Sequence, residues 1–567
     1  MLTTHTIPVH DPVARHPPAE PALQAIARAK KAEQARLMPK EWTIEPAYLR
    51  RFAPDTEAYK IMSESGILSE YELELTESLE GSTLGGRILA GEVSASDVVR
   101  ASCKRAAIAH QLTNCLTEIL FDSALSHARV LDEHLARTGQ LVGPLHGWPI
   151  SLKDQFNIEG VDTTMGFVSL VGQPAQHAST LVEILERLGA VIIAKTNVPQ
   201  TLMAEESNNY VFGRTLNPHN RSLISGGSSG GEGALVALKG SLVGVGTDFG
   251  GSIRKPSVYC GLYGLRPTTG RLPYRDVSNV MKGFEGIKST IGPIARDVRT
   301  IEAFMQAVIG AEPWLSDVTV IEKAWTCPSR SERLKIAVVY DDQVVHNHPP
   351  VQRALEETVA ALRHSGHTVI EWTPFDHVHV QRLFGELAAA DGGADLQSFV
   401  AKSREPIVPE AFPFNSSSAK NVYELSQLVQ KRDAFRQEVR RRWAQSDVDD
   451  GRRVDAILCP AAPHLAMPPA GKPRAAELIS WTTIWSLADL PVCAIPVGTF
   501  DPIKDTARGL PGPAYNTSDQ AHWDSYSPSM FSRAPIGLQL VSPRQHTEAE
   551  LLGMVAAVDR ARAAFEL

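Results

Sequence analysis

Residues 180–197 read TLVEILERLGAVIIAKTN, and the hydrophobic pattern changes its period halfway along this stretch. Residues 180–189 carry apolar side chains at helical spacing and end on a glycine, which is typical of a helix C-terminus. Residues 191–194 form a short apolar run, which is typical of a buried strand. A helix followed at once by a buried strand predicts an α/β fold.

The same alternation continues on both sides of this stretch. Strand-like runs occur in GWPISLKDQFNI (147–158) and SLVGVGTD (241–248), and Gly143 marks where the alternation begins. Further strands are predicted at 335–340, 368–372, 454–460, 491–497 and 536–541, and further helices at 350–365, 422–443 and from 547. Residues 501–532, rich in Gly, Pro, Ser and Tyr, are predicted as one long loop. Because no clean linker separates these blocks, we expect one large domain over residues 141–567.

The N-terminal part has a different character. Residues 1–20 are polar and Pro-rich and are predicted to be a disordered tail. Residues 21–140 are predicted as a helical region packed on the core, with helices at 21–37 and 71–109, the second one broken around 81–91. Two N-capping patterns support these helices: Ser69 with Glu72, and Ser94 with Asp97.

Composition narrows the class of protein. The chain has 567 residues, 43% of them hydrophobic, and a formal net charge of -8. This acidic balance does not favour binding nucleic acid or an anionic membrane by bulk electrostatics. The six cysteines form no CxxC pair, which predicts reduced, mostly buried thiols and no zinc site. The most apolar window, 481–500, contains Asp489 and two prolines, so we expect a buried helix, turn and strand there and a cytoplasmic protein.

Two glycine-rich loops carry serines 24 positions apart: GGSSGGEG (226–233) and GTDFGGSIR (246–254). The first lacks the Lys-Ser/Thr ending of a phosphate-binding loop, and the second lacks the glycine spacing of a dinucleotide fold. GGSSG does fit a nucleophile-elbow pattern, but no β-rich run leads into it. A Ser-His-Asp esterase therefore stays an alternative that requires a histidine within reach of its serine.

A lysine offers a different partner for the two serines. Lys153 ends the strand-like run PISLK in apolar company, and burial disfavours the charged ammonium form. A neutral lysine is a base that could take a proton from one serine, which takes it from the second. The glycines beside the nucleophile leave backbone N–H groups free for a developing oxyanion.

Several stretches together resemble the amidase signature family: PLHGWPISLKDQFNIEG (144–160), AKTNVPQTLM (194–203), FGRTLNP (212–218), GGSSGGEGAL (226–235), GVGTDFGGSIRKPSVYCGLYGLRPTTGR (244–271) and PIGLQL (535–540). The EGAL ending is similar to the branch that contains fungal acetamidases and fatty acid amide hydrolase. The resemblance implies an α/β fold with a central, mixed, twisted β-sheet covered by helices on both faces.

The resemblance also implies roles for individual residues. Lys153 would be the base, Ser228 the relay serine after a cis peptide, and Ser252 the nucleophile. The remaining expected site residues are the oxyanion-hole amides of Phe249, Gly250, Gly251 and Ser252, the loop-bracing pair Asp248 and Arg254, the hydrogen-bonding Ser229, and the acyl-pocket residue Met203.

The implied activity is hydrolysis of a carboxylic acid amide through an acyl-enzyme, with no metal or cofactor. We expect small aliphatic or aryl-acyl amides as substrates, and a homodimer. Four alternatives stay open: a specialised amide or ester hydrolase of secondary metabolism, a fatty acid amide hydrolase, a transamidosome-type amidotransferase subunit, and a non-catalytic scaffold. The EGAL ending and the N-terminal extension speak against the transamidosome subunit, and the presence of all three catalytic residues speaks against the scaffold.

Overall fold

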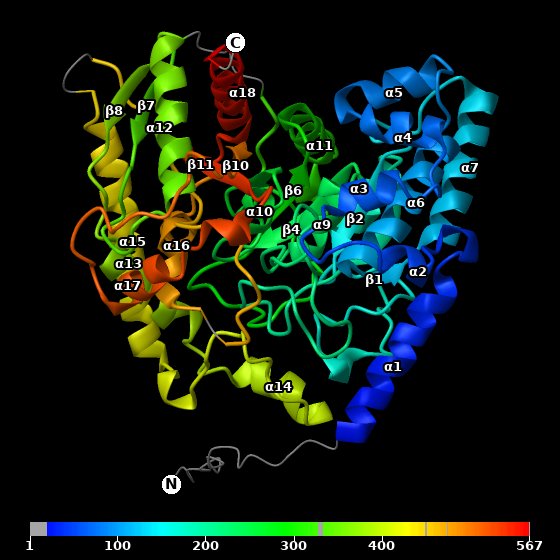
Figure 1. Ribbon diagram of the computed structural model, residues 1–567, viewed down its shortest axis with the longest axis horizontal. Helices are drawn as coiled ribbons and strands as arrows, with labels where there is room; N and C mark the ends of the chain where they lie inside the picture. The colour runs from blue at the N-terminus through cyan, green and yellow to red at the C-terminus, as the bar shows by residue number, and fades with distance from the viewer. Residues whose placement is uncertain (1–19, 327–332, 448–450, 473, 566–567) are drawn as a thin grey trace.

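A single sheet of 11 strands runs through the molecule (Figure 1). The computed structural model describes residues 20–326, 333–447, 451–472 and 474–565. In their order across the sheet, the strands are β1 (Leu116–Ile119), β3 (Val191–Thr196), β2 (Pro149–Lys153), β4 (Val243–Asp248), β6 (Thr290–Ala295), β5 (Tyr263–Arg266), β10 (Val492–Thr499), β11 (Pro535–Val541), β9 (Ala456–Pro460), β7 (Lys335–Val338) and β8 (Thr368–Glu371).

The sheet is mixed, as predicted. Strand β2 pairs in parallel with β3 and β4, and β7 pairs in parallel with β8 and β9. All pairs between β4 and β9 across the centre are antiparallel, and β1 is antiparallel to β3 at one edge. The two parallel segments therefore lie near opposite ends of the sheet, joined by an antiparallel centre.

Side chains of β2 alternate between the two faces of the sheet. Ile150 and Leu152 belong to the largest apolar cluster, which the helices of one face complete. Ser151 and Lys153 therefore point to the opposite face, where the Ser151 hydroxyl donates to Glu232 of α9. This alternation places the predicted catalytic lysine between the sheet and the helix that follows the first serine loop.

Helices cover both faces, as predicted. The face with Ile150 is covered by α8 (Thr180–Arg187), α11 (Val298–Gly310), α12 (Pro349–His364) and α18 (Glu548–Phe565). The opposite face is covered by α9 (Gly230–Ala237), α10 (Arg254–Tyr259), α13 (His377–Ala388), α15 (Val422–Ala444) and α16 (Ser480–Ala488). Two further helices, α14 (Ala394–Ser403) and α17 (Thr517–Asp524), lie outside these layers.

Helix α10 packs unusually close to the sheet because glycines face it. A Cβ at Gly264 of β5 would lie 2.0 Å from Ser257 Oγ, and one at Gly537 of β11 would lie 2.4 Å from Val258 Cγ1. No side chain larger than hydrogen fits at either position without moving the helix. These glycines thus fix the depth of α10, whose first residue follows the second serine loop.

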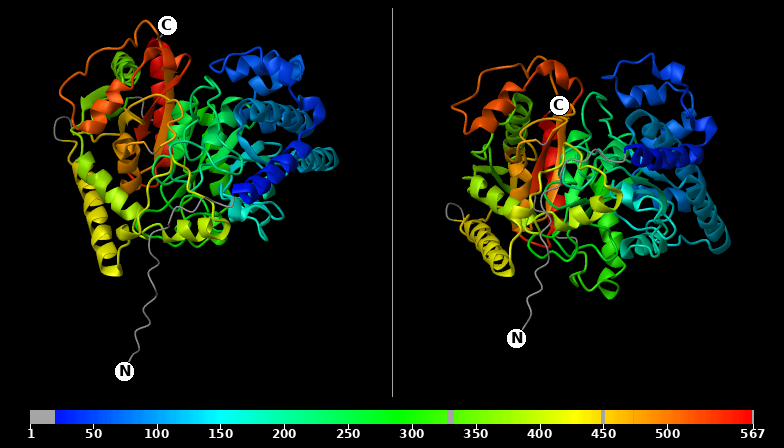
Figure 2. Two further views of the ribbon diagram at one scale, coloured as in Figure 1. Left: turned by 60° about the horizontal axis from the view of Figure 1, so that its bottom comes forward. Right: turned by 90° about the horizontal axis from the view of Figure 1, so that it is seen from below.

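The N-terminal helices gather at one end of the molecule, the blue to cyan end in Figures 1 and 2. They are α1 (Glu20–Leu37), α2 (Pro46–Leu49), α3 (Ala58–Ser63), α4 (Glu70–Glu77), α5 (Gly81–Leu89), α6 (Ala95–Thr113) and α7 (Phe121–Thr138). This region also supplies β1, which joins the central sheet through β3. The division at residue 140 stays a prediction. The N-terminal region is not only helical, because it contributes the edge strand β1 to the central sheet.

Two predictions about local structure were wrong. Residues 81–91 do not break the helical region, because α5 forms there with Leu84 and Ile88 buried, and Gly81 lies where a Cβ would meet the Trp148 ring at 2.3 Å. Residues 501–532 are not one loop, because α17 forms within them, capped by the Asn516 side chain. In both places, packing and capping outweigh a composition rich in glycine or turn formers.

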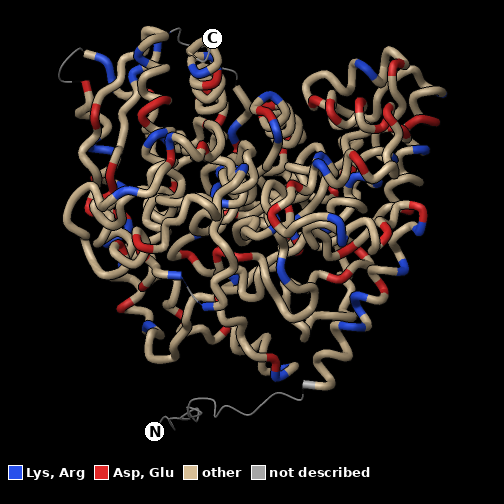
Figure 3. The backbone as a smooth tube through the Cα atoms, in the orientation of Figure 1, with Lys and Arg blue, Asp and Glu red and all other residues tan. Residues whose placement is uncertain are grey.

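Five of the six cysteines, Cys103, Cys115, Cys260, Cys459 and Cys493, are buried and free. Cys327 and residues 1–19 of the tail predicted at 1–20 lie outside the described residues, and Glu20 begins α1. Within the described part of the chain, no helix is both long and apolar enough to span a membrane. Figure 3 shows positive and negative residues interspersed over the described backbone.

A cluster of three buried histidines lies between the start of α12 and α17. The ring of His348 stacks on His522 with centroids 3.9 Å apart, and His464 packs 5.4 Å from His522. Burial lowers the pKa of His348 to about 3 and that of His464 to about 4, and it lowers the pKa of His522 well below its usual value. All three rings are therefore neutral in the folded protein at neutral pH.

This cluster predicts a loss of stability in acid. Below pH 6.5 the unfolded chain takes up protons on these histidines and the folded chain does not, so the free energy of unfolding falls as the pH drops from about 6.5 towards 4. Each histidine contributes up to ~1.4 kcal/mol per pH unit. Urea unfolding of wild type at several pH values should show this slope, and His348→Gln should flatten it. The exposed His379→Gln variant should keep the wild-type slope, and an equal effect of both variants would contradict the assignment.

Candidate active site

Both serine loops lie at the end of β4, on the face of the sheet that α9 and α10 cover. Ser228 precedes α9, and the Gly227–Ser228 peptide bond is cis, as the family resemblance implies. Ser252 lies between β4 and α10 and is partly exposed. The Ser229 N–H donates to the Ser252 carbonyl at 3.1 Å, which docks one loop against the other.

Lys153 lies beneath these loops at the end of β2 and is fully buried. Its Nζ is 2.7 Å from Ser228 Oγ and 2.8 Å from Thr247 Oγ1. Burial lowers the pKa of Lys153 to about 7, although the charges of Asp248 and Glu232 act in the opposite direction. A lysine with this pKa changes its protonation state near neutral pH, and Ser228 Oγ lies within hydrogen-bond distance of it.

Asp248 and Arg254 hold the second serine loop from inside. The Asp248 carboxylate accepts from the Gly251 N–H at 2.8 Å, from the Ile253 N–H at 3.1 Å and from both Nε and Nη2 of Arg254 at 3.0 Å. Burial alone would raise the pKa of Asp248, but Arg254 and Arg266 outweigh it and lower the pKa to about 2. The loop is thus closed around a permanently ionised carboxylate.

The guanidinium of Arg254 extends this brace to α16 and β11. It donates to the Thr482 carbonyl at 3.0 Å, to Ser486 Oγ at 2.8 Å and to Gln539 Oε1 at 3.3 Å. The Thr482 hydroxyl in turn donates to the Gly250 carbonyl at 2.6 Å. The backbone of the serine loop is therefore held from both sides.

The four predicted oxyanion-hole amides differ in their surroundings. The Gly251 N–H already donates to Asp248, and its φ of +132° favours glycine. Phe249, Gly250 and Ser252 are partly exposed, and their N–H groups donate to no acceptor within the described residues. Among the four amides, the Gly251 N–H is therefore occupied, and the other three are without an acceptor in the part of the chain that the structure describes.

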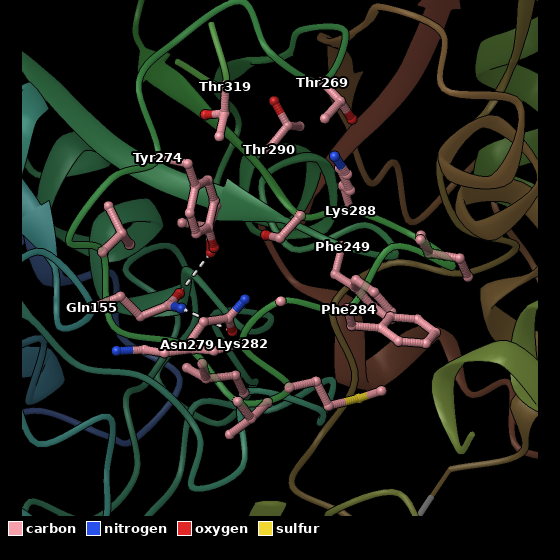
Figure 4. Close-up of a pocket in the computed structure, with 18 of the residues that line it drawn as sticks. Gln155, Phe249, Thr269, Tyr274, Asn279, Lys282, Phe284, Lys288, Thr290 and Thr319 are labelled. Carbon is pink, nitrogen blue, oxygen red and sulfur yellow. Dashed lines mark hydrogen bonds between the residues drawn. The ribbon is translucent and has the colours of Figure 1, made fainter. Parts of the chain in front are cut away.

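Two cavities meet at Ser252. The larger, of about 480 Å³, is also lined by Ser228, Thr247 and Gln155 and by polar residues of the segment 269–290 (Figure 4). The smaller, of about 300 Å³, has mainly apolar walls, formed by residues that include Phe249, Phe384, Ala388, Phe412, Phe414 and Ile479. Met203 lines both cavities, as Ser252 does, and its role in an acyl pocket stays a prediction.

The structure adds residues that sequence reasoning missed. Thr247 contacts Lys153 directly, and Gln155 contacts Thr247. Glu232 is fully buried and accepts from Ser151 and Thr196, and burial raises its pKa to about 8. All three lie within the quoted motifs, but no spacing rule indicates which of their side chains face the lysine. Within the described residues, no group of three or more His, Cys, Asp or Glu side chains is arranged to hold a metal ion.

Comparisons with known proteins point to the amidase family. A family model described as Amidase matches residues 97–552. An acetamidase of Emericella nidulans is 37% identical over 538 residues, covering 93% of this chain and 96% of the relative. A protein of Gibberella moniliformis described as an amidase is 35% identical over 565 residues, covering 96% of this chain and 100% of the relative.

Solved structures show the same likeness. A fatty acid amide hydrolase superposes with a TM-score of 0.88 at 31% identity, covering 96% of each chain. A bacterial aryl acylamidase superposes with a TM-score of 0.64 at 20% identity, which shows a shared fold. The chain belongs to the amidase family and has the fold of the amidase signature enzymes.

The brace around Asp248 predicts a large loss of stability when its charge is removed. Asp248→Asn keeps the volume but leaves two buried guanidinium groups, Arg254 and Arg266, without their shared anion, which typically costs about 3–5 kcal/mol. Denaturant unfolding measures this loss. The matched control is Glu550→Gln, which breaks the exposed ion pair with Arg544 and should cost less than about 1 kcal/mol. Similar stability of the two variants would contradict the brace.

Proposed function

We propose that this chain is an amidase that hydrolyses a carboxylic acid amide through an acyl-enzyme on Ser252, with Ser228 as proton relay and Lys153 as base. The observation that carries the proposal is the buried Lys153, with its Nζ 2.7 Å from Ser228 Oγ and its pKa lowered to about 7 by burial. A lysine in this state can act as a general base, which a solvated lysine cannot do at neutral pH.

In the first half-reaction, Ser252 Oγ bonds to the amide carbonyl carbon. Its proton passes to Ser228, and the Ser228 proton passes to Lys153 Nζ. The carbonyl oxygen becomes an oxyanion, and the free amides of Phe249, Gly250 and Ser252 are placed to stabilise it. The tetrahedral intermediate then breaks its C–N bond, and the relay returns one proton to the leaving nitrogen.

In the second half-reaction, water replaces the amine. Water bonds to the acyl carbon and loses one proton through the same relay to Lys153. The ester bond to Ser252 Oγ breaks, the relay returns the proton to Ser252, and the carboxylic acid leaves. Every proton that Lys153 takes up is released again within the half-reaction, so the enzyme ends each cycle as it began.

The cavities indicate the size of the substrate. At about 300 Å³, the apolar cavity lies at the lower end of the usual range for small-molecule sites, and its walls carry four phenylalanines. This favours a small aliphatic or aryl acyl group there. The larger and more polar cavity on the other side of Ser252 then receives the amine side of the amide.

Ammonia release from a graded panel of primary amides tests the proposal. The panel runs from acetamide through hexanamide to oleamide, with benzamide and indole-3-acetamide as aryl members. We expect wild type to prefer the short or aryl members, and Ser252→Ala and Lys153→Ala each to lose at least about a hundredfold in kcat, the scale of nucleophilic and general-base contributions.

Labelling with a fluorophosphonate provides the control. It should modify wild type at Ser252 and leave Ser252→Ala unlabelled. Full activity of Lys153→Ala at neutral pH would contradict the relay. A preference for oleamide over every short amide would move the substrate class to fatty acid amides.

The pH dependence of kcat/KM should report Lys153. The base must be neutral in the free enzyme, so activity should be full above pH 7 and fall as the pH drops through about 7, where Lys153 becomes protonated. The measurement is kcat/KM for the best panel amide between pH 5.5 and 9, and the labelling rate of Ser252 should follow the same curve. A flat profile down to pH 5.5 would mean that another group is the base.

A further inference from the structure

A short chain of hydrogen bonds leads from the catalytic lysine to Gln155. Lys153 Nζ lies 2.8 Å from Thr247 Oγ1, and the Thr247 hydroxyl lies 2.6 Å from Gln155 Oε1. All three residues are at least nine-tenths buried. Gln155 is not a member of the proposed relay. It reaches Lys153 only through Thr247, which contacts both residues.

The orientation of the Gln155 amide is fixed by the acceptors of its NH₂ group, the Ser278 carbonyl and, at 3.4 Å, Asn279 Oδ1. Its Nε2 lies 2.8 Å from the Ser278 carbonyl, and a carbonyl oxygen can only accept a hydrogen bond. The NH₂ group must therefore face Ser278, and the amide oxygen must face Thr247. The backbone supports this arrangement, because the Ser278 N–H donates to the Gln155 carbonyl at 2.8 Å. Figure 4 shows the Tyr274 hydroxyl turned to Gln155 as well.

This orientation determines where the protons lie. The amide oxygen of Gln155 can only accept, so the single proton of the Thr247 hydroxyl must point to Gln155. Thr247 Oγ1 then presents only lone pairs to Lys153, and Lys153 must donate to it. The Thr247 carbonyl, 3.5 Å from Nζ, lies on the side of a second N–H. A neutral amine with both protons so occupied keeps its one lone pair for Ser228, at 2.7 Å.

We propose that Gln155 is a positioning residue: by accepting the Thr247 proton, it keeps the lone pair of neutral Lys153 directed at Ser228. Without this acceptor, the Thr247 hydroxyl can turn and donate to the lysine lone pair, and Lys153 then faces Ser228 with a proton in place of a base. The inference rests on the proposed function, because it assigns Lys153 the role of base.

The test uses two isosteric changes and their combination in the full chain. Gln155→Met keeps the volume and removes the acceptor, and Thr247→Val removes the hydroxyl on which Gln155 acts. We expect Gln155→Met to lower both kcat and the labelling rate of Ser252 by about tenfold, a fraction of the full general-base contribution, with KM unchanged. The double variant should be no slower than Thr247→Val alone, because Gln155 acts through the hydroxyl that is already gone.

Two further variants separate positioning from loop structure. Asn157→Ala removes a side chain that holds the same loop through the Asp276 carbonyl at 2.8 Å and Ser278 Oγ at 3.1 Å. It should leave the labelling rate unchanged. Gln155→Glu keeps an oxygen acceptor facing Thr247, so at pH values above the acid limb of its own profile it should restore most of the rate lost in Gln155→Met. Its negative charge should also shift the acid limb of the pH profile to higher pH.

Three results would overturn the inference: a wild-type labelling rate in Gln155→Met, multiplicative losses in the double variant, or an equal loss in Asn157→Ala. Failure of the proposed function looks different. If wild type hydrolyses no amide on the panel but Ser252 still labels, the substrate class is wrong, and the labelling rates still decide the role of Gln155. If Lys153→Ala labels as fast as wild type, the relay itself is wrong. Should Gln155→Met fail to fold, Gln155→Glu and the shifted acid limb carry the test.

Discussion

Burial of one ammonium group is the constraint on which the site depends. Lys153 ends a strand whose residues are all buried, and its own side chain is fully buried. Removing a charge of this kind from water costs several kcal/mol unless the group is paired or loses its proton. No carboxylate forms an ion pair with it within the described residues, so burial lowers its pKa to about 7. The contacts around Lys153 are hydroxyl and carbonyl groups, which suit an amine that alternates between its two states.

The neighbouring carboxyl groups explain why the lysine stays unpaired. Asp248 is ionised, but its oxygens are occupied by two arginines and by backbone N–H groups of the serine loop. Glu232 lies on the same face as Lys153 and is held by Ser151 and Thr196, and burial raises its pKa to about 8. Asp248 is thus already paired within the serine loop, and Glu232 favours its neutral form. Either group, if free and ionised beside Lys153, would return the lysine to its charged state and remove the base.

The sequence predicted most of the elements, for reasons that are local. The strand and helix at 180–197, the capping residues Ser69 and Ser94 and the strand that ends at Lys153 all follow from short-range patterns. The helix at 81–89 was not predicted by such a pattern. Its Leu84 and Ile88 are buried against residues that are distant in the sequence. Contacts such as Thr247 to Gln155 join residues 92 positions apart, and their direction depends on carbonyl groups that no side-chain motif records.

The position of Ser252 between two unlike cavities adds a final constraint. The apolar cavity is not wholly apolar, because Lys255, three residues after the nucleophile, lines it together with Glu205. Lys255 Nζ lies 2.7 Å from Glu205 Oε1, and the Tyr259 hydroxyl donates to the same oxygen at 2.8 Å. This pair ties α10 to the segment that carries Met203, so buried hydrogen bonds join one wall of the apolar cavity to the helix that follows Ser252. A change that displaces the Glu205 carboxylate would therefore also remove a buried partner of Lys255 and of Tyr259, which both belong to that helix.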